Sequence, residues 1–273
     1  MIARVIWLYV LVIFPFCFAQ AKATKGAEDR GQSIAEKVYN RPTGKDSVGF
    51  AQMLIQPKSG SARKREFFMF QRRPKPNEIA SLIRFLMPAD VKDVGLLTLD
   101  DAGDESDQWI YLSASGGRIR RISSKRKDGS FVNSDIFFED LRDREVKMDK
   151  HVFLGEESVN GVKLYKVEST PVKKDNSAYS KRVAWIHPES WVPIKMEAYK
   201  SGRKSPWKVT QVFKLEKVQG IWTVLDSETQ NLVTGSKTRM VVKQVKYNLG
   251  LPESLFTQKV LEDPRREEKY RQL

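Results

Sequence analysis

The side chains that could carry chemistry are few and poorly grouped in this sequence. There are two histidines, His151 and His187, and neither has a second histidine or a cysteine at metal-ligand spacing. We find no serine in the nucleophile-elbow pattern, no glycine-rich phosphate loop and a single cysteine, Cys17. These observations favour a protein that is not an enzyme and that uses no metal or other cofactor.

Carboxylates cluster in two places, and each cluster has a simpler interpretation than a reactive site. The acidic run over residues 100–107 could suggest calcium, but it lacks the ligand spacing of an EF-hand, so a solvated hairpin loop is favoured. Glu139 and Asp140 could form a catalytic pair. Adjacent residues need not face one site, however, and nothing else in the sequence supports catalysis there.

Two adjacent arginines suggest ion pairing rather than catalysis. On a strand, Arg120 and Arg121 would point to opposite faces, and an inward arginine must pair with a carboxylate. The carboxylates close by in sequence are Asp135, Glu139 and Asp140. We therefore predict a latch between these two groups, built from partly exposed ion pairs that are individually weak.

The chain begins with the features of a secretion signal. Arg4 precedes an apolar run over residues 5–18, and Ala19-Gln20-Ala21 forms a small-x-small cleavage pattern. The run is shorter than the ~20 residues that a membrane-spanning helix needs. We expect a signal peptide over residues 1–21, cleavage after Ala21, and a soluble mature protein in the periplasm.

The cysteine and the charge limit the surroundings of the mature chain. Phe16 precedes Cys17 where a lipoprotein signal would have a small residue, so Cys17 is interpreted as signal core and not as a lipid anchor. The formal net charge is +14. Export argues against nucleic acid as the anionic partner, so we expect either an anionic membrane surface or an ordinary basic, solvated surface.

Alternating apolar and polar residues dominate the mature chain and predict strands joined by turns. After a flexible terminus at residues 22–29 and a short helix at 33–39, we expect one antiparallel sheet or incomplete barrel in a single domain, residues 22–273. Asn160-Gly161 is a strong hairpin signal. The other predicted strands are 47–56, 64–72, 79–87, 95–99, 108–112, 118–123, 183–187, 192–199, 209–215, 222–230 and 237–247.

Residues 131–141 interrupt this pattern because they are aromatic and acidic at once. Ser134 or Asp135 could cap a short helix with Ile136, Phe137 and Leu141 on its apolar face. The segment is either an ordinary packed connection or a lid over a cavity. The lid candidates are Phe131, Ile136, Phe137, Phe138 and Leu141.

Four blocks, taken in order, resemble the outer-membrane lipoprotein-sorting protein family, the LolA-like group. They are LIRFLMPADVKDVG at 82–95, WIYL at 109–112 with RIRRI at 118–122, the segment 131–141, and WIHPESWVPIK at 185–195. Three residues depart from the usual pattern, which affects local turn geometry: Ser113 and His187 replace a proline and an aspartate, and Asn133 replaces a glycine.

The resemblance implies a mainly β (α+β) fold, a half-open antiparallel β-barrel with short helices over its concave face. It also implies a periplasmic carrier or chaperone that binds acyl chains of lipids or lipoproteins, and that could serve an inner-membrane transporter. The alternative is a lipid- or peptide-sensing regulatory domain that acts on a membrane partner. Strand parity does not say which face is concave; the candidate cavity residues are Phe68, Phe70, Phe85, Met87, Leu97, Trp109 and Tyr111.

Overall fold

The computed structural model describes residues 24–75, 77–100, 106–113, 116–123, 127–159 and 161–273. The predicted signal peptide, with Cys17 and the cleavage site after Ala21, lies outside the described residues. Within the described ranges, no helix combines the length and the apolar character needed to cross a membrane.

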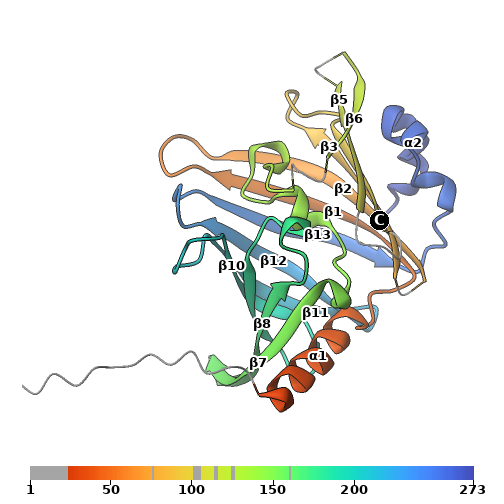
Figure 1. The fold of residues 1–273 in the computed structure, drawn as a ribbon. Helices are drawn as coiled ribbons and strands as arrows, with labels where there is room; N and C mark the ends of the chain where they lie inside the picture. The colour runs from red at the N-terminus through yellow and green to blue at the C-terminus, as the bar shows by residue number, and fades with distance from the viewer. Residues whose placement is uncertain (1–23, 76, 101–105, 114–115, 124–126, 160) are drawn as a thin grey trace, which may run out of the picture.

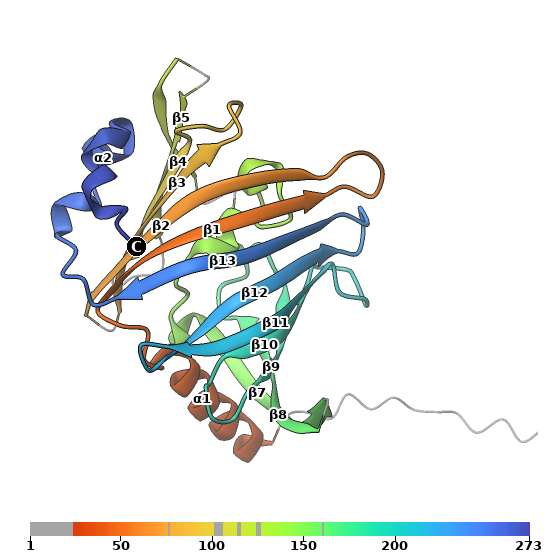
Figure 2. The same ribbon diagram turned by 180° about the vertical axis from the view of Figure 1, so that it is seen from behind.

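Thirteen strands form one antiparallel sheet in the order β6-β5-β4-β3-β2-β1-β13-β12-β11-β10-β9-β8-β7. The sheet curves strongly but does not close, since β6 and β7 are its two edges (Figures 1 and 2). The predicted half-open β-barrel is thereby confirmed. The strands are β1 (Asp46–Gln56), β2 (Arg63–Lys75), β3 (Glu78–Met87), β4 (Gly95–Asp100), β5 (Ser106–Leu112), β6 (Arg118–Arg121), β7 (Asp149–Val159), β8 (Val162–Pro171), β9 (Lys181–Ile186), β10 (Pro193–Tyr199), β11 (Lys208–Val218), β12 (Ile221–Asn231) and β13 (Lys237–Tyr247).

The half of the sheet formed by β1 to β6 is apolar on both faces. Successive side chains of a strand point to opposite faces, and β2 shows the result. Phe67 and Met69 pack into a cluster on the inner, concave face, whereas Phe68 and Phe70 pack into a cluster on the outer face. Each face of this half therefore needs its own covering layer.

The inner face is covered by a connection between β6 and β7 that we call the crossing segment, residues 127–148 (Figure 1). It contains three short 3-10 helices, η3 (Phe131–Asn133), η4 (Phe138–Leu141) and η5 (Val146–Met148). The predicted helix capped by Ser134 or Asp135 is wrong. Ser134 ends η3, and η4 begins only at Phe138, where the Asp140 carboxylate accepts the backbone N–H of Phe137 at 2.8 Å.

The outer face is covered by the C-terminal cover, residues 249–273, which the sequence analysis left unassigned (Figure 2). It contains η7 (Glu253–Leu255), α2 (Gln258–Glu262), η8 (Pro264–Arg266) and η9 (Glu268–Tyr270). Arg84 of β3 anchors it: this fully buried guanidinium pairs with Glu267 at 3.0 Å. Gly95, paired with Arg84 on β4, leaves the necessary room, because a Cβ there would lie 2.8 Å from the guanidinium.

Helix α1 (Lys25–Tyr39) lies over the sheet half formed by β7 to β9. It begins earlier than predicted because Thr24 caps it, accepting the N–H of Ala27 at 3.3 Å, so residues 25–29 are helical and not a flexible terminus. Gly31 permits its close approach, since a Cβ there would lie 2.7 Å from the His151 backbone. A further short helix, η6 (Lys174–Asn176), follows β8.

Candidate functional site

The predicted cavity residues fall on opposite faces of the sheet. Phe85 is buried in the packed inner cluster, whereas Met87 at the end of β3 is 48% exposed. The other five pack against the C-terminal cover, which corrects their assignment to a concave cavity: Phe68, Phe70, Leu97, Trp109 and Tyr111. Side chains alternate between the two faces of the sheet as predicted. The two covering layers determine which face is the inner one and which is the outer one.

Aromatic side chains of the crossing segment fill the inner face of β1 to β6. Phe131 lies 5.6 Å from Phe85 and 6.0 Å from Phe138 between ring centroids, and all three rings are buried. Ile136 and Leu141 join the same cluster. Four of the five lid candidates therefore pack into the core beneath this half of the sheet.

Phe137, the fifth lid candidate, points into a separate cluster. Its ring lies 4.9 Å from the ring of Trp207 and 6.3 Å from that of Tyr179, and the Lys208 ammonium sits 3.5 Å from its centre. Phe137 is 5% exposed. The crossing segment thus contacts both halves of the sheet, which ties them together across the concave face.

Glu139 and Asp140 of the crossing segment are paired, but not with the predicted partners. Glu139 is 1% exposed at its side chain and lies within 3.2 Å of Arg142 and 3.4 Å of Arg182. Asp140, whose side chain is 19% exposed, accepts from the buried Lys208 at 2.5 Å and from the Tyr179 hydroxyl at 2.6 Å. The predicted latch to Arg120 and Arg121 is therefore corrected to pairs with Arg142, Arg182 and Lys208.

Asp135 and Arg121 also have partners other than the predicted ones. Asp135 is buried and accepts from the hydroxyls of Ser236 and Thr238, on the turn before β13 and on β13 itself. Arg121, on the edge strand β6, instead pairs with Asp107 on the neighbouring strand β5, and Arg120 is exposed. Neither of these two arginines pairs with the carboxylates predicted as its latch partners.

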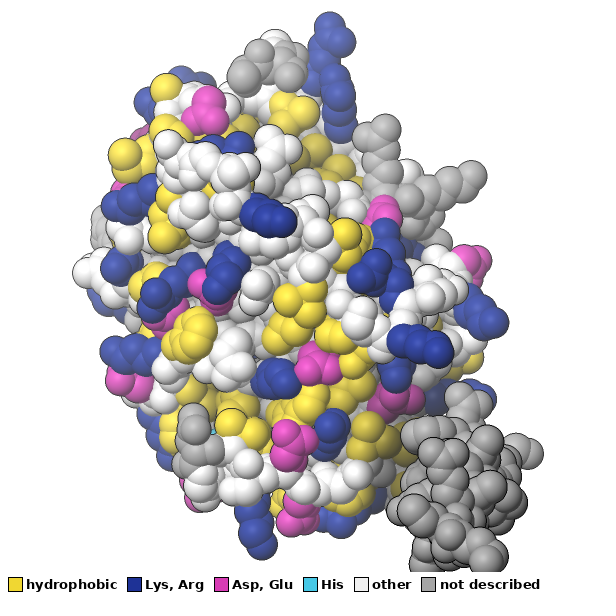
Figure 3. Space-filling model, turned by 90° about the vertical axis from the view of Figure 1, so that its left-hand side faces the viewer, with side chains coloured by type: hydrophobic (Ala, Val, Ile, Leu, Met, Phe, Trp, Pro, Cys, Tyr) yellow, Lys and Arg dark blue, Asp and Glu magenta, His cyan; other side chains and the backbone are white. Residues whose placement is uncertain are grey.

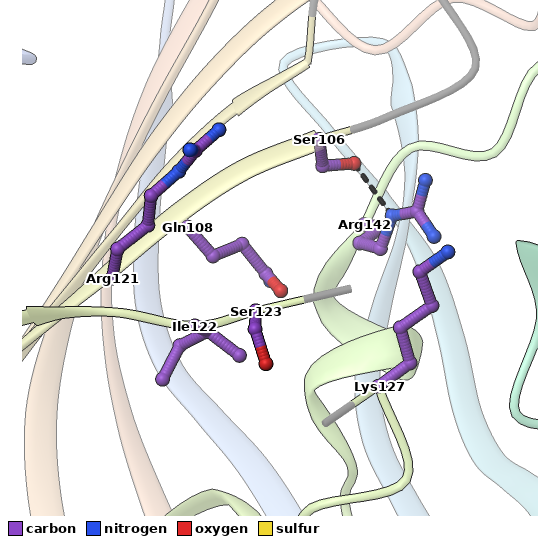
Figure 4. Close-up of a pocket in the computed structure, with 7 residues that line it drawn as sticks. All are labelled: Ser106, Gln108, Arg121, Ile122, Ser123, Lys127 and Arg142. Atoms are coloured by element: carbon purple, nitrogen blue, oxygen red, sulfur yellow. Dashed lines mark hydrogen bonds between the residues drawn. The ribbon is translucent and has the colours of Figure 1, made fainter. Parts of the chain in front are cut away.

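A small polar pocket of about 200 Å³ lies between β5, β6 and the crossing segment (Figure 4). Arg121, Lys127 and Arg142 are the cations that line it. Arg142 donates to the Ser106 hydroxyl at 2.6 Å and pairs with Glu139, so its guanidinium already has partners within the protein. This pocket offers little apolar surface to a ligand.

A cavity of about 260 Å³, which we call the main cavity because most of its wall is apolar and not because of its size, lies on the concave side just beyond the end of α1. Its apolar wall comes from β2, β12 and β13 and from the residue before β10: Met69, Ile221, Trp222, Val242, Val245 and Val192. Thr223 and Tyr247 also line it, and their hydroxyls lie 2.8 Å apart. No member of this wall was among the predicted site residues.

A second cavity of about 200 Å³ lies beneath α1, against β7 to β9. Val38, Val167 and Ile186 form part of its wall, and Arg41 is shared with the main cavity. Arg41 follows the helix, and its guanidinium donates to the Val38 carbonyl at 2.6 Å. Burial lowers the pKa of Arg41, and the nearby Arg73 adds to that effect while Asp143 opposes it.

His151 in the wall of the second cavity is held in place and not poised for catalysis. Its Nδ1 lies 2.8 Å from the Ser169 hydroxyl and its Nε2 lies 3.0 Å from the Val146 carbonyl. Burial lowers its pKa, which favours the neutral ring. Among the described residues, no group of three or more His, Cys, Asp or Glu side chains could hold a metal ion.

Comparisons with known proteins identify a matching family model and solved structures with a similar fold. A family model described as "Uncharacterized protein" matches residues 77–263. A domain named for outer membrane lipoprotein sorting, from Vibrio parahaemolyticus, is 26% identical with a TM-score of 0.81, covering 86% of this chain and 99% of that chain. A DUF1329 family protein from Desulfovibrio piger is 29% identical with the same TM-score and the same coverage of both chains.

A more distant relative extends the similarity in fold. The LolA superfamily protein NE2245 from Nitrosomonas europaea is 18% identical with a TM-score of 0.67, covering 84% of this chain and 98% of that chain. No protein of curated function matches the sequence. The similarity therefore establishes the fold, whereas the ligand of the cavities has to be inferred from the residues that line them.

Proposed function

Because this chain belongs to the family whose model matches residues 77–263 and has the LolA-like fold of lipoprotein-sorting domains, we propose that it is a periplasmic carrier of acyl chains. In this function the mature chain, residues 22–273, is one domain that shields the apolar part of a lipid or lipidated protein in transit. An inner-membrane transporter is the partner that we propose would load or unload it.

The main cavity is the observation that carries this proposal. It lies on the concave side of the sheet, and aliphatic and aromatic side chains form most of its wall. Each methylene group that leaves water for such a wall contributes about 0.8 kcal/mol. The crossing segment fills the inner face around Phe85, so the proposed site lies farther along the concave side, against β1, β2, β12 and β13.

The surface supports an anionic membrane as a docking partner. Figure 3 shows a face on which Lys and Arg side chains, together with fewer Asp and Glu side chains, lie among scattered groups of hydrophobic side chains. The net charge of +14 favours approach to anionic lipid, at about 1 kcal/mol for each basic residue near the membrane surface. Salt should therefore slow transfer of a bound lipid to anionic vesicles.

Binding of a fluorescent fatty acid to the delipidated mature protein tests the carrier function. We expect saturable binding, and we expect Val245→Trp to abolish it by filling the main cavity. Val233→Trp is the matched control, because Val233 is 54% exposed in the turn between β12 and β13. Absence of saturable binding in the unaltered protein, or equal binding by both variants, would argue against this site.

A lipid-sensing regulatory domain predicts a different outcome in the same system. A carrier should release its ligand to acceptor vesicles, whereas a sensor should retain it and transfer little. Mass spectrometry of the lipid that co-purifies with the mature protein would identify the natural ligand in either case.

A further inference from the structure

Arg41 occupies a distinctive position at the end of α1. It lies in the walls of both cavities, and it follows Asn40, the residue at which the helix ends. Among the described residues, Val38 is the hydrogen-bond acceptor of its guanidinium. A guanidinium has five N–H donors in a planar arrangement, so one backbone carbonyl leaves most of this donor capacity available on the cavity side.

The wall of the main cavity is otherwise uncharged. Among the described residues that line it, Arg41 is the one with a charged side chain, and the polar remainder consists of neutral groups such as Gln71, Thr223 and Tyr247. A cation is costly to bury without an anion beside it. A cavity with apolar walls and one cation suits a ligand with an apolar chain and an anionic end.

The neighbours of Arg41 do not supply that anion in full. Asp143 lies nearby, but it also pairs with Arg73 at 3.3 Å, so one carboxylate serves two guanidinium groups. The Tyr39 hydroxyl belongs to the same cluster, and burial together with Asp143 raises its pKa to about 12, which keeps it neutral. Arg41 therefore shares its nearby carboxylate with a second guanidinium.

We propose that Arg41 binds the carboxylate or phosphate of a single-chain anionic lipid whose acyl chain lies in the main cavity. This inference rests on the proposed carrier function and names its ligand class. Carboxylates and phosphates accept two parallel hydrogen bonds from a guanidinium, which gives both strength and orientation. The cavity volume of about 260 Å³ lies at the small end of ligand pockets, which favours one chain over several.

Titration calorimetry with the delipidated mature protein tests the head-group contact. The probes are dodecanoate, dodecyl phosphate and dodecanol, which share one chain length and differ in the head. We expect Arg41→Met to weaken binding of the preferred anionic probe by roughly tenfold to a hundredfold, the usual range for a hydrogen bond to a charged group. Dodecanol binding should change by no more than about twofold, because the apolar wall is intact. The stronger of the two anionic probes identifies the head group.

Two controls separate this contact from a general loss of structure. Arg203→Met changes an exposed arginine after β10 and should leave all three affinities unchanged. Arg41→Lys keeps the charge and should restore part of the anion affinity. If Arg41→Met does not fold, the unaltered protein decides: it should bind dodecanoate or dodecyl phosphate at least about tenfold more tightly than dodecyltrimethylammonium.

The possible results distinguish a failure of the head-group proposal from a failure of the carrier function. If the unaltered protein binds dodecanol, the cationic probe and the anionic probes equally, or if Arg41→Met weakens all probes equally, the head-group proposal is wrong while the carrier function stands. If it binds none of them, the carrier function itself fails.

Discussion

The crossing segment and the C-terminal cover lie on opposite faces of the same six strands, and they are anchored in different ways. The C-terminal cover has one fully buried cation at its centre: Arg84 pairs with Glu267 and also donates to the carbonyls of Asp93, Val260 and Leu261. Where the cover begins, the buried Asp46 carboxylate accepts the backbone N–H groups of residues 249–251. The crossing segment distributes its charges over several pairs, centred on Glu139 and Asp140. The outer layer thus has one dominant buried ion pair, whereas the inner layer has several.

This difference explains where space remains for a ligand. The C-terminal cover packs apolar side chains against the whole outer cluster. The crossing segment packs against part of the inner face and then turns toward β7, where its residues 143–146 line the second cavity beneath α1. The main cavity adjoins the second cavity at Arg41, on the concave side.

The largest expected effect comes from the anchor of the C-terminal cover. Arg84→Met leaves the Glu267 carboxylate buried without its main partner, which should lower the free energy of unfolding by about 3 to 5 kcal/mol. Urea denaturation of the mature protein measures it. Arg265→Met is the control, since its solvent-exposed pair with Asp263 should contribute little to stability. Equal effects from both variants would show that the buried anchor has no special weight.

A similar but smaller effect is expected on the inner face, where the lid function stays a prediction. Phe137→Asp removes a ring packed against Tyr179 and Trp207 and places a carboxylate there, although Lys208 can partly compensate. We expect a loss of about 3 kcal/mol in unfolding free energy. Weaker ligand binding in a protein that stays folded would support a lid. Global unfolding would identify the crossing segment as fixed core, and unchanged affinity and stability would make it a surface connection.

Local patterns predicted the strands because alternation is a local property. The order of apolar residues in β2 and the Asn160-Gly161 signal need no knowledge of distant residues, and β7 and β8 pair as a hairpin up to Val159 and Val162 on either side of that signal. The missed start of α1 also had a local signal, since Thr24 is a good capping residue. Most of the architecture could therefore be predicted from neighbouring residues alone.

The sheet face on which a side chain lies and the partners of the charged side chains could not be predicted, because residues distant in sequence determine both. Phe68 and Phe70 lie on the outer face because residues 249–273 fold back over it. Asp140 pairs with Lys208, 68 residues away, and Asp135 with Thr238, 103 residues away. Arg41 had one usable signal, a cation at the end of a helix before Pro42, but nothing local places it beside a cavity.

The dependence of stability on pH should separate the inner layer from the outer one. Burial raises the pKa of Asp100 to about 6, and burial also raises that of Asp143, which donates its N–H to the Asp100 carboxylate. The folded protein thus holds protons that the unfolded chain releases near pH 4, so stability should fall as the pH rises from about 4 to about 6.

The Asp100 contribution to this fall is at most about 3 kcal/mol, and Asp100→Asn should remove it. Denaturation series across the same pH range compare the variant with the unaltered protein. Asp149, whose pKa is lowered by its Arg144 and Arg182 partners against the effect of burial, acts in the opposite direction at lower pH. An unchanged slope in Asp100→Asn would mean that this carboxyl is ionised in the folded protein.

The smallest expected effect concerns Arg121, which was predicted to form a latch because carboxylates lie close to it in sequence. Arg121 is 65% exposed at its side chain and pairs with Asp107, so Arg121→Gln should change the unfolding free energy by less than about 1 kcal/mol. Arg182→Gln is the informative counterpart, because Arg182 is 14% exposed and contacts both Glu139 and Asp149. Its loss leaves two buried carboxylates with fewer donors and should cost clearly more than the loss of Arg121. If the two variants were equally stable and only Arg121→Gln altered ligand release, the exposed edge would be the true latch, and the buried pairs would serve the fold alone.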